Sequence, residues 1–266
     1  ELAITQTERR AIIQGFLEPT AQELEDGLKT PTLAHRAIAA MVKSGHIRVI
    51  VTTNFDRLME NALRDLGIEP TVVSSEDTLA GAEPLTHTQC YIFKIHGDYK
   101  DARILNTDAE LGEYPVAFDG QLDRIIDEFG LIVAGWSGEW DHALRAAFLR
   151  APSRRYPTFW LSRGSVSERG QELIAHRKAV LVQSGDADVF FGGLSQKLET
   201  IQQSRQLNPV GADMSIAMAK RFLARPEHRI QLDDLFSGET HKVIAHFSPI
   251  FATDQTRSQQ NPTDWV

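Results

Sequence analysis

The stretch Ile47-Arg48-Val49-Ile50-Val51-Thr52-Thr53-Asn54-Phe55-Asp56 joins an apolar run to a polar turn and decides the fold class. Residues 47–53 are β-branched and apolar almost throughout, which predicts a strand buried on both faces, as in a parallel sheet. From Phe55 to Leu66 the apolar residues share one helical face, and Gly67 is expected to end that helix. A strand that leads directly into a helix predicts half of a parallel crossover unit.

The same pattern recurs along the chain. Further strands are predicted at residues 90–95, 131–135, 157–161 and 179–183, and helices at 5–17, 33–42, 122–129, 140–148 and 189–204. Alternating strands and helices predict an α/β fold with a doubly wound, mostly parallel, Rossmann-like sheet. We expect residues 1–205 to form this domain. Residues 206–266, with one helix at 215–223, are expected to form a small helical C-terminal appendage or partial domain.

Composition excludes several classes of function. The 266 residues carry 28 basic and 36 acidic side chains, a net charge of −8, which argues against direct binding of nucleic acid. The sequence has no apolar run of the roughly 18 residues that a membrane span needs. No secretory signal is visible, so we expect a cytoplasmic protein. Cys90 is the one cysteine, so neither an internal disulfide nor a four-thiolate zinc site can form, and we expect no metal.

Polar groups follow three of the predicted strands. Asn54 and Asp56 follow the first, His96 and Gly97 the second, and Gly135-Trp136-Ser137-Gly138 the third. In an open parallel sheet, ligands bind beyond the carboxyl ends of the strands. We therefore expect an amide, a carboxylate, an imidazole and a loop of small residues at one edge of the sheet.

Each of these groups also has a purely structural interpretation. Asn54 and Asp56 suit the cap of the helix that follows them, and a single histidine is often held by a backbone carbonyl. The glycines of the 135–138 loop suit tight turns, although the same loop before a helix offers free N–H groups to a phosphate. Taken together, the groups fit a nucleotide whose ribose is attacked.

The order and spacing of these motifs resemble those of sirtuin-like (silent-information-regulator-type) domains. The residues that carry the resemblance are Pro31 to His35, Thr52 to Asp56, Lys94 to Gly97 and Gly135 to Ser137, within a region of roughly residues 31–198. In sirtuins, a Pro-x-x-x-His helix precedes strands that end in Thr-Gln-Asn-Ile-Asp, His-Gly and Gly-x-Ser.

Two details resemble the bacterial branch of the family found in antiphage defence proteins. One is the Thr-Thr-Asn-Phe-Asp form of the first motif, followed by Arg57 to Glu60. The other is the segment from Ala187 to Phe191 before the last predicted helix of the domain.

The resemblance implies hydrolysis of NAD to nicotinamide and ADP-ribose, that is, an NAD+ glycohydrolase that needs no metal. It implies that Asn54 positions the water or the ribose hydroxyls, and that His96 is the general base. Asp56 would hold the nicotinamide side or orient Asn54. The implied NAD-binding residues are Thr53 and Phe55, then Gly135, Trp136 and Ser137 at phosphate or ribose, and Ser162 and Arg163 at the adenosine end.

Two features depart from the family pattern. Deacylating sirtuins carry a four-cysteine zinc module between the His-Gly strand and the Gly-x-Ser strand. This chain has no cysteine after Cys90 and only about 35 residues between those strands, which favours hydrolysis over deacylation. Sirtuin-like domains also begin with a strand and a Gly-Ala-Gly-x-Ser loop. Before Pro31 the glycines are Gly15 and Gly27, so we expect that strand and loop to lie upstream of Glu1.

Other functions stay open at this point. The chain could be a catalytically silent regulatory module that binds NAD or ADP-ribose, or, less expected, a protein deacylase without zinc. A dehydrogenase fits worse, because its glycine fingerprint is missing. Unregulated hydrolysis of NAD would kill the host, so the resemblance implies a gate: a homo-oligomer, an Argonaute-type partner or a sensor partner.

Overall fold

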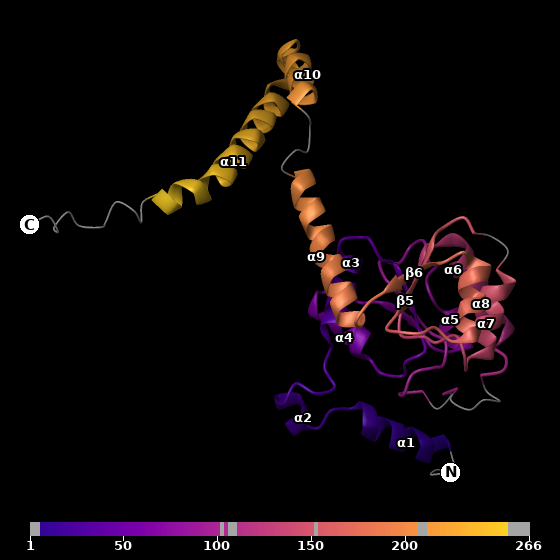
Figure 1. Ribbon diagram of the computed structural model, residues 1–266. Coiled ribbons are helices and arrows are strands. Elements are labelled where there is room, and N and C mark those ends of the chain that lie inside the picture. Colours follow the sequence, from indigo (N-terminus) through magenta and orange to yellow (C-terminus); the bar gives the residue numbers. More distant parts are fainter. Residues whose placement is uncertain (1–5, 102–103, 106–110, 152–153, 207–211, 255–266) are drawn as a thin grey trace, which may run out of the picture. The chain divides into compact units, whose positions relative to one another are not determined.

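The computed structural model describes residues 6–101, 104–105, 111–151, 154–206 and 212–254 (Figure 1). Its strands are β1 (Val49–Thr52), β2 (Thr71–Val73), β3 (Tyr91–Lys94), β4 (Leu131–Val133), β5 (Thr158–Ser162) and β6 (Val180–Gln183). They form two parallel three-stranded sheets, in the orders β1-β3-β2 and β4-β5-β6. The fold is therefore α/β and Rossmann-like, as predicted, with its strands divided between two sheets.

Helices alternate with these strands. They are α1 (Gln6–Leu17), α2 (Ala21–Glu25), α3 (Leu33–Lys43), α4 (Leu58–Asp65), α5 (Glu76–Ala80), α6 (Val116–Glu128), α7 (His142–Arg150), α8 (Glu168–Arg177), α9 (Ala187–Gln206), α10 (Ala212–Leu223), the 3-10 turn η1 (Pro226–His228) and α11 (Arg229–Asp254). The chain divides into two compact units, residues 1–197 and 198–266. In the part of the chain described, none of the helices combines the length and the apolar character that crossing a membrane requires.

Strand β3 lies at the centre of the first sheet, and all four of its residues are buried. Its side chains alternate between two cores, as the pleat of a strand requires. Ile92 packs in a cluster with residues of α3 and α4, including Leu63, whereas Phe93 packs in a cluster with residues of α6, including Phe118. Helices thus contribute to the cores on both faces of this sheet, which is the doubly wound arrangement.

Strands β1 and β4 are edge strands, which corrects one prediction. Both were expected to be buried on both faces, yet Val51 is 36% exposed and Ile132 is 40% exposed. Each pairs with one neighbour only among the described residues, so fewer side chains surround its faces than surround those of the central strand β3. One core nevertheless includes residues of both sheets, because Phe93 and Trp160 belong to the same cluster.

Most predicted helices are present, and Gly67 follows α4 with a φ of +76°, a conformation that favours glycine. Trp140 was expected to face inward on a helix, but it precedes α7 and is 70% exposed. The prediction missed the strand β2 and the helices α2, α5, α8 and α11. Helix α8 buries Leu173 as its one large apolar side chain, so it has no stripe to detect.

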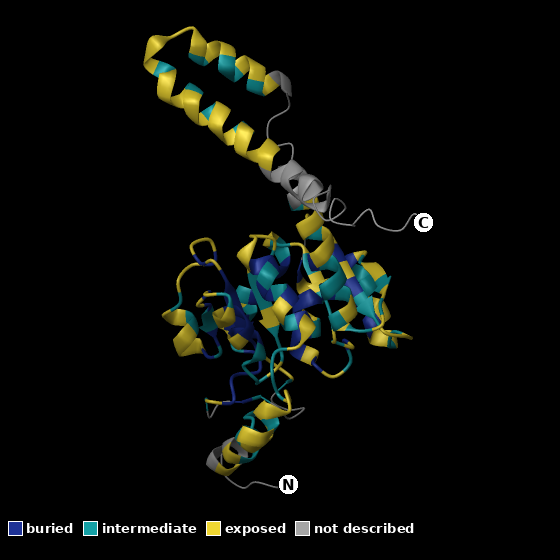
Figure 2. Ribbon diagram, turned by 90° about the vertical axis from the view of Figure 1, so that its left-hand side faces the viewer, coloured by how far each residue is buried: buried dark blue, intermediate teal, exposed yellow. Residues whose placement is uncertain are grey.

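The second unit contains the helical C-terminal region that the sequence predicted. Helices α10 and α11 pack against each other, and their described residues are mostly exposed (Figure 2). The large apolar side chains that remain exposed there include Met214, Leu223, Ile230 and Phe236.

Replacing Phe93 by alanine tests the role of β3. The Phe93 side chain is fully buried and its ring lies 4.8 Å from that of Phe118, so we expect a loss of about 3–5 kcal/mol in the free energy of unfolding. Urea denaturation measures this loss. Val116→Ala, at a residue that is 88% exposed, is the control and should change little. A Phe93→Ala loss as small as that of the control would contradict the assigned core.

Candidate functional site

The loop after β1 presents Asn54 at the carboxyl edge of the first sheet. Asn54 is exposed, its backbone N–H donates to Thr52 Oγ1 at 3.0 Å, and its side-chain amide has no hydrogen-bond partner among the described residues. Asp56 is engaged differently, because its Oδ1 accepts a hydrogen bond from the Leu58 N–H at 2.9 Å, at the start of α4. Asp56 thus binds the first N–H of α4 from the position before the N-cap residue Arg57, whereas the Asn54 amide is available to a ligand.

The Asn54 loop lies against His96, which follows β3. The rings of Phe55 and His96 have centroids 6.4 Å apart. The Tyr99 N–H donates to the Phe55 carbonyl oxygen at 3.2 Å, and the Ile95 N–H donates to the Thr52 carbonyl oxygen at 3.1 Å. These contacts bring Thr53, Asn54 and Phe55 to the same strand edge as His96.

His96 belongs to a buried cluster of three polar side chains. Its Nε2 lies 2.6 Å from Asp141 Oδ2 and 3.1 Å from the Tyr114 hydroxyl, which itself donates to Asp141 Oδ2 at 2.6 Å. Asp141 is fixed in turn, because its Oδ1 accepts from the Leu144 N–H at 2.8 Å, at the start of α7. The partner of His96 is therefore a carboxylate, not the backbone carbonyl of the structural interpretation.

The charge state of this cluster follows from its pKa shifts. Burial alone would raise the pKa of Asp141, but hydrogen bonds from His96 and Tyr114 outweigh burial and hold that pKa below its usual value. Burial, together with the nearby Asp141 charge, raises the pKa of Tyr114 far above its usual value. At neutral pH Asp141 is thus ionised, and its Oδ2 accepts a hydrogen bond from the N–H group at His96 Nε2. In neutral His96, this tautomer leaves the lone pair on Nδ1.

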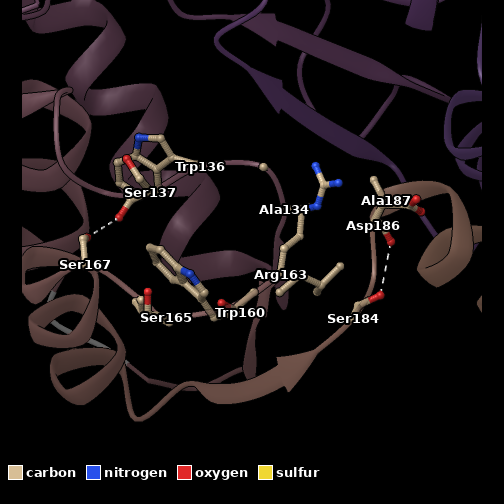
Figure 3. Close-up of a pocket in the computed structure, with 14 residues that line it drawn as sticks. Ala134, Trp136, Ser137, Trp160, Arg163, Ser165, Ser167, Ser184, Asp186 and Ala187 are labelled. Atoms are coloured by element: carbon tan, nitrogen blue, oxygen red, sulfur yellow. Dashed lines mark hydrogen bonds between the residues drawn. The ribbon is translucent and has the colours of Figure 1, made fainter.

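A pocket of about 360 Å³ lies at the carboxyl ends of β4, β5 and β6 (Figure 3). This volume is within the range of roughly 300–1,000 Å³ that small-ligand sites occupy. Five predicted NAD-binding residues line it: Gly135, Trp136, Ser137, Ser162 and Arg163. Thr53, Asn54, Phe55, Asp56 and His96 do not line it.

The pocket combines an arginine with the N-terminal ends of two helices. Ser167 caps α8 and donates through Oγ to the Ser137 carbonyl oxygen at 2.9 Å, and Asp186 Oδ1 accepts from the Val189 N–H in the first turn of α9. Arg163 extends from β5 toward the start of α9, where its Nε donates to the Gly185 carbonyl oxygen at 2.9 Å (Figure 3). The Asp186 carboxylate covers the positive end of α9, so the groups that favour an anionic ligand are Arg163 and the N-terminal end of α8.

The helix that follows the 135–138 loop does not offer the phosphate site predicted for it. Helix α7 begins at His142, beyond Glu139 and Trp140, and Asp141 caps its N-terminus. The intervening residues and the capping carboxylate separate the loop from the positive end of α7. The helix ends that border the pocket are those of α8 and α9.

One loop connects the pocket with the histidine cluster. The loop comprises residues 134–141. It begins after β4 with Ala134 and Gly135, which line the pocket, and it ends at Asp141, which bonds to His96. Gly138 within it has a φ of +73°, and a Cβ at this position would lie 3.1 Å from Leu173 Cδ1. This close approach to α8 helps to fix the path of the loop between the two features.

The sequence predictions assigned no role in the site to three buried polar residues, Tyr114, Asp141 and Lys94. Asp141 could be found only as a helix cap, and Tyr114 lies in a segment without a pattern. Lys94 gave a clearer signal, because a charge inside an apolar strand requires a buried partner. No group of three or more His, Cys, Asp or Glu side chains in the described part of the chain is placed to hold a metal ion.

A comparison with protein families matches residues 48–179 to the SIR2-like domain. The match runs from β1 through α8 and includes Asn54, His96 and Asp141. No curated protein matches the chain.

Asp141→Asn tests the charge state of the histidine cluster. Because the pKa of Asp141 is lower in the folded protein than in the unfolded chain, its contribution to stability is complete above about pH 4 and is lost as the pH falls through the lowered value. We therefore expect the difference in unfolding free energy between wild type and Asp141→Asn to shrink below about pH 4. Urea denaturation at several pH values measures it, with the exposed Asp65→Asn as control. A difference that is constant with pH would contradict the ionised Asp141.

Proposed function

Residues 48–179 are a SIR2-like domain, and from that premise we propose that the chain hydrolyses NAD to nicotinamide and ADP-ribose. SIR2-like domains use NAD. The observation that carries the proposal is the pairing of His96 with Asp141 beside the loop that presents the Asn54 amide. Parallel α/β sheets bind ligands at this edge.

In the proposed reaction, water attacks C1′ of the nicotinamide ribose. The bond between C1′ and the nicotinamide nitrogen breaks, its electron pair leaves with nicotinamide, and the water oxygen becomes the new hydroxyl of ADP-ribose. His96 accepts the proton of the water at Nδ1, since Nε2 is committed to Asp141. Asn54 hydrogen-bonds to the water or the ribose hydroxyls, and Asp141 positions His96 and stabilises its charged form.

The remainder of NAD is assigned to the pocket. No Gly-x-Gly loop precedes Pro31 in this sequence, and the pocket holds groups that suit the pyrophosphate. We assign that role to Arg163 and the N-terminus of α8, with Ser137 and Ser162 as hydrogen-bonding groups. The open edges of β1 and β4 also offer places where a further parallel strand could pair and add a phosphate loop.

The biological setting is part of the same proposal. We place the hydrolysis in bacterial antiphage defence, in the cytoplasm, with activity held back until an oligomer or a partner releases it. The support is the form of the motifs at residues 52–60 and 187–191. Within the second of these, Asp188 accepts hydrogen bonds from Thr32 Oγ1 at 2.7 Å and the Ala34 N–H at 2.6 Å, and so connects α9 with the start of α3.

Alanine variants of Asn54 and His96 test the proposed chemistry. We expect each to lower the rate of nicotinamide release from NAD by a factor of about 10²–10⁴, the usual effect of losing a general base or its equivalent. Chromatography of NAD and nicotinamide measures the rate, and the exposed Asn61→Ala and His87→Ala are controls. Asp56→Ala should lose about 1 kcal/mol of stability through its cap and keep turnover. If wild type binds NAD without releasing nicotinamide, the chain is a silent binding module instead.

Arg163→Gln tests the assignment of the pocket. The variant keeps the side-chain length roughly but loses the charge, so we expect the KM for NAD to rise at least tenfold with little change in kcat. The effect should weaken at high salt, because an exposed charge is screened. Arg155→Gln, at an exposed arginine that does not line the pocket, is the matched control. An unchanged KM in Arg163→Gln would exclude the pyrophosphate assignment.

A further inference from the structure

Lys94 is a charged side chain in the interior of the first unit. It is the last residue of β3, where its side chain is 0% exposed, and the neighbouring strand residues are apolar. An ammonium group buried in this way is strongly destabilising unless several acceptors surround it. Its four hydrogen-bond acceptors lie on three different segments, so the identity of those segments shows what Lys94 holds together.

Two of the acceptors belong to the loop that carries Asn54. Lys94 Nζ donates to the carbonyl oxygen of Phe55 at 3.2 Å and to that of Asp56. Lys94 is also paired in register with Thr52, the last residue of β1. The side chain therefore reaches from β3 across to the segment that leaves β1, immediately after Asn54.

The other two acceptors are carboxylates that are themselves buried. Lys94 Nζ lies 3.1 Å from Glu60 Oε1, on α4, and 3.0 Å from Asp98 Oδ2, in the turn after β3. Arg57 Nε also bonds to Asp98, at 3.0 Å, so two cations face two anions. Burial would raise the pKa of Asp98, but the Lys100 N–H and the Lys94 charge outweigh burial and keep that pKa low.

This geometry separates two roles for Lys94. A merely structural lysine would neutralise Glu60 and Asp98 and have no effect on the ligand-binding loop. The two carbonyl contacts go further, because they hold two successive peptide groups, those that begin with the carbonyls of Phe55 and Asp56. Both groups are thereby fixed to β3, the strand that leads to His96. His96 is two residues from Lys94 along the chain.

We propose that Lys94 is a positioning residue, which holds the Asn54 loop at a fixed distance from His96. This inference rests on the proposed function for its effect on NAD hydrolysis, but the hold on the loop is independent of it. Glu60 and Asp98 orient the Lys94 ammonium toward the two carbonyl oxygens. Loss of Lys94 leaves Asn54 and His96 in the protein but frees the backbone between them.

The double variant Lys94→Met/Glu60→Leu separates positioning from folding. It removes one buried cation together with one buried anion, and Asp98 keeps its partner Arg57. We expect a folded protein in which kcat for NAD hydrolysis falls at least tenfold and the KM stays within threefold. Hydrogen exchange of the backbone amides of residues 54–57, followed by mass spectrometry, should become at least tenfold faster. Arg150→Met/Asp123→Leu removes a surface ion pair in the same way and should change neither quantity.

Each outcome decides the proposal. A folded double variant with wild-type kcat, or with wild-type exchange at residues 54–57, would overturn it and leave Lys94 a purely structural charge. If the double variant fails to fold, Lys94→Met/Glu60→Gln, which keeps a polar side chain of the same size at position 60, replaces it with the same expectations. If the wild-type chain hydrolyses no NAD, the proposed function fails separately, and the exchange of residues 54–57 still shows whether Lys94 holds the loop.

Discussion

The hydrogen bond between His96 and Asp141 is the interaction on which the candidate site depends. His96 stands at the end of the central strand of the first sheet, and Asp141 ends the loop that leaves the first strand of the second sheet. Their contact at 2.6 Å is buried, and Tyr114 completes it. A buried polar cluster is stable only when its members are all satisfied, so this one constrains both strand ends at the same time. It ties the strand end beside the Asn54 loop to the loop that borders the pocket.

The two halves of the site differ in what they can do chemically. The side near His96 offers a base and an amide, which suits attack at a ribose carbon. The pocket side offers Arg163, hydroxyl groups and the N-terminus of α8, which suits the anionic part of a dinucleotide. One loop, residues 134–141, contributes to both, which fits the proposed single substrate that reaches from the pocket to His96.

Local patterns in the sequence predicted the elements and the residues at the strand ends, since apolar periodicity and turn residues are read over a few positions. Asn54, His96 and Gly135 were found in this way. The partners of His96 could not be found, because Tyr114 and Asp141 are 18 and 45 residues away and only tertiary packing brings them together. The exposure of β1 and β4 was missed for a related reason: a strand's own sequence does not show whether both of its edges will be paired. Helix α8, which supplies Ser167 to the pocket, has no apolar stripe that would reveal it.

The most direct test measures both products of the proposed reaction. The chain is incubated with NAD, and nicotinamide and ADP-ribose are separated and quantified by chromatography and mass spectrometry. We predict equal amounts of the two products from the wild-type chain, and rates lower by a factor of about 10²–10⁴ in the Asn54→Ala and His96→Ala variants. Intact NAD with the wild-type chain, or wild-type rates in either variant, would contradict the proposed hydrolysis.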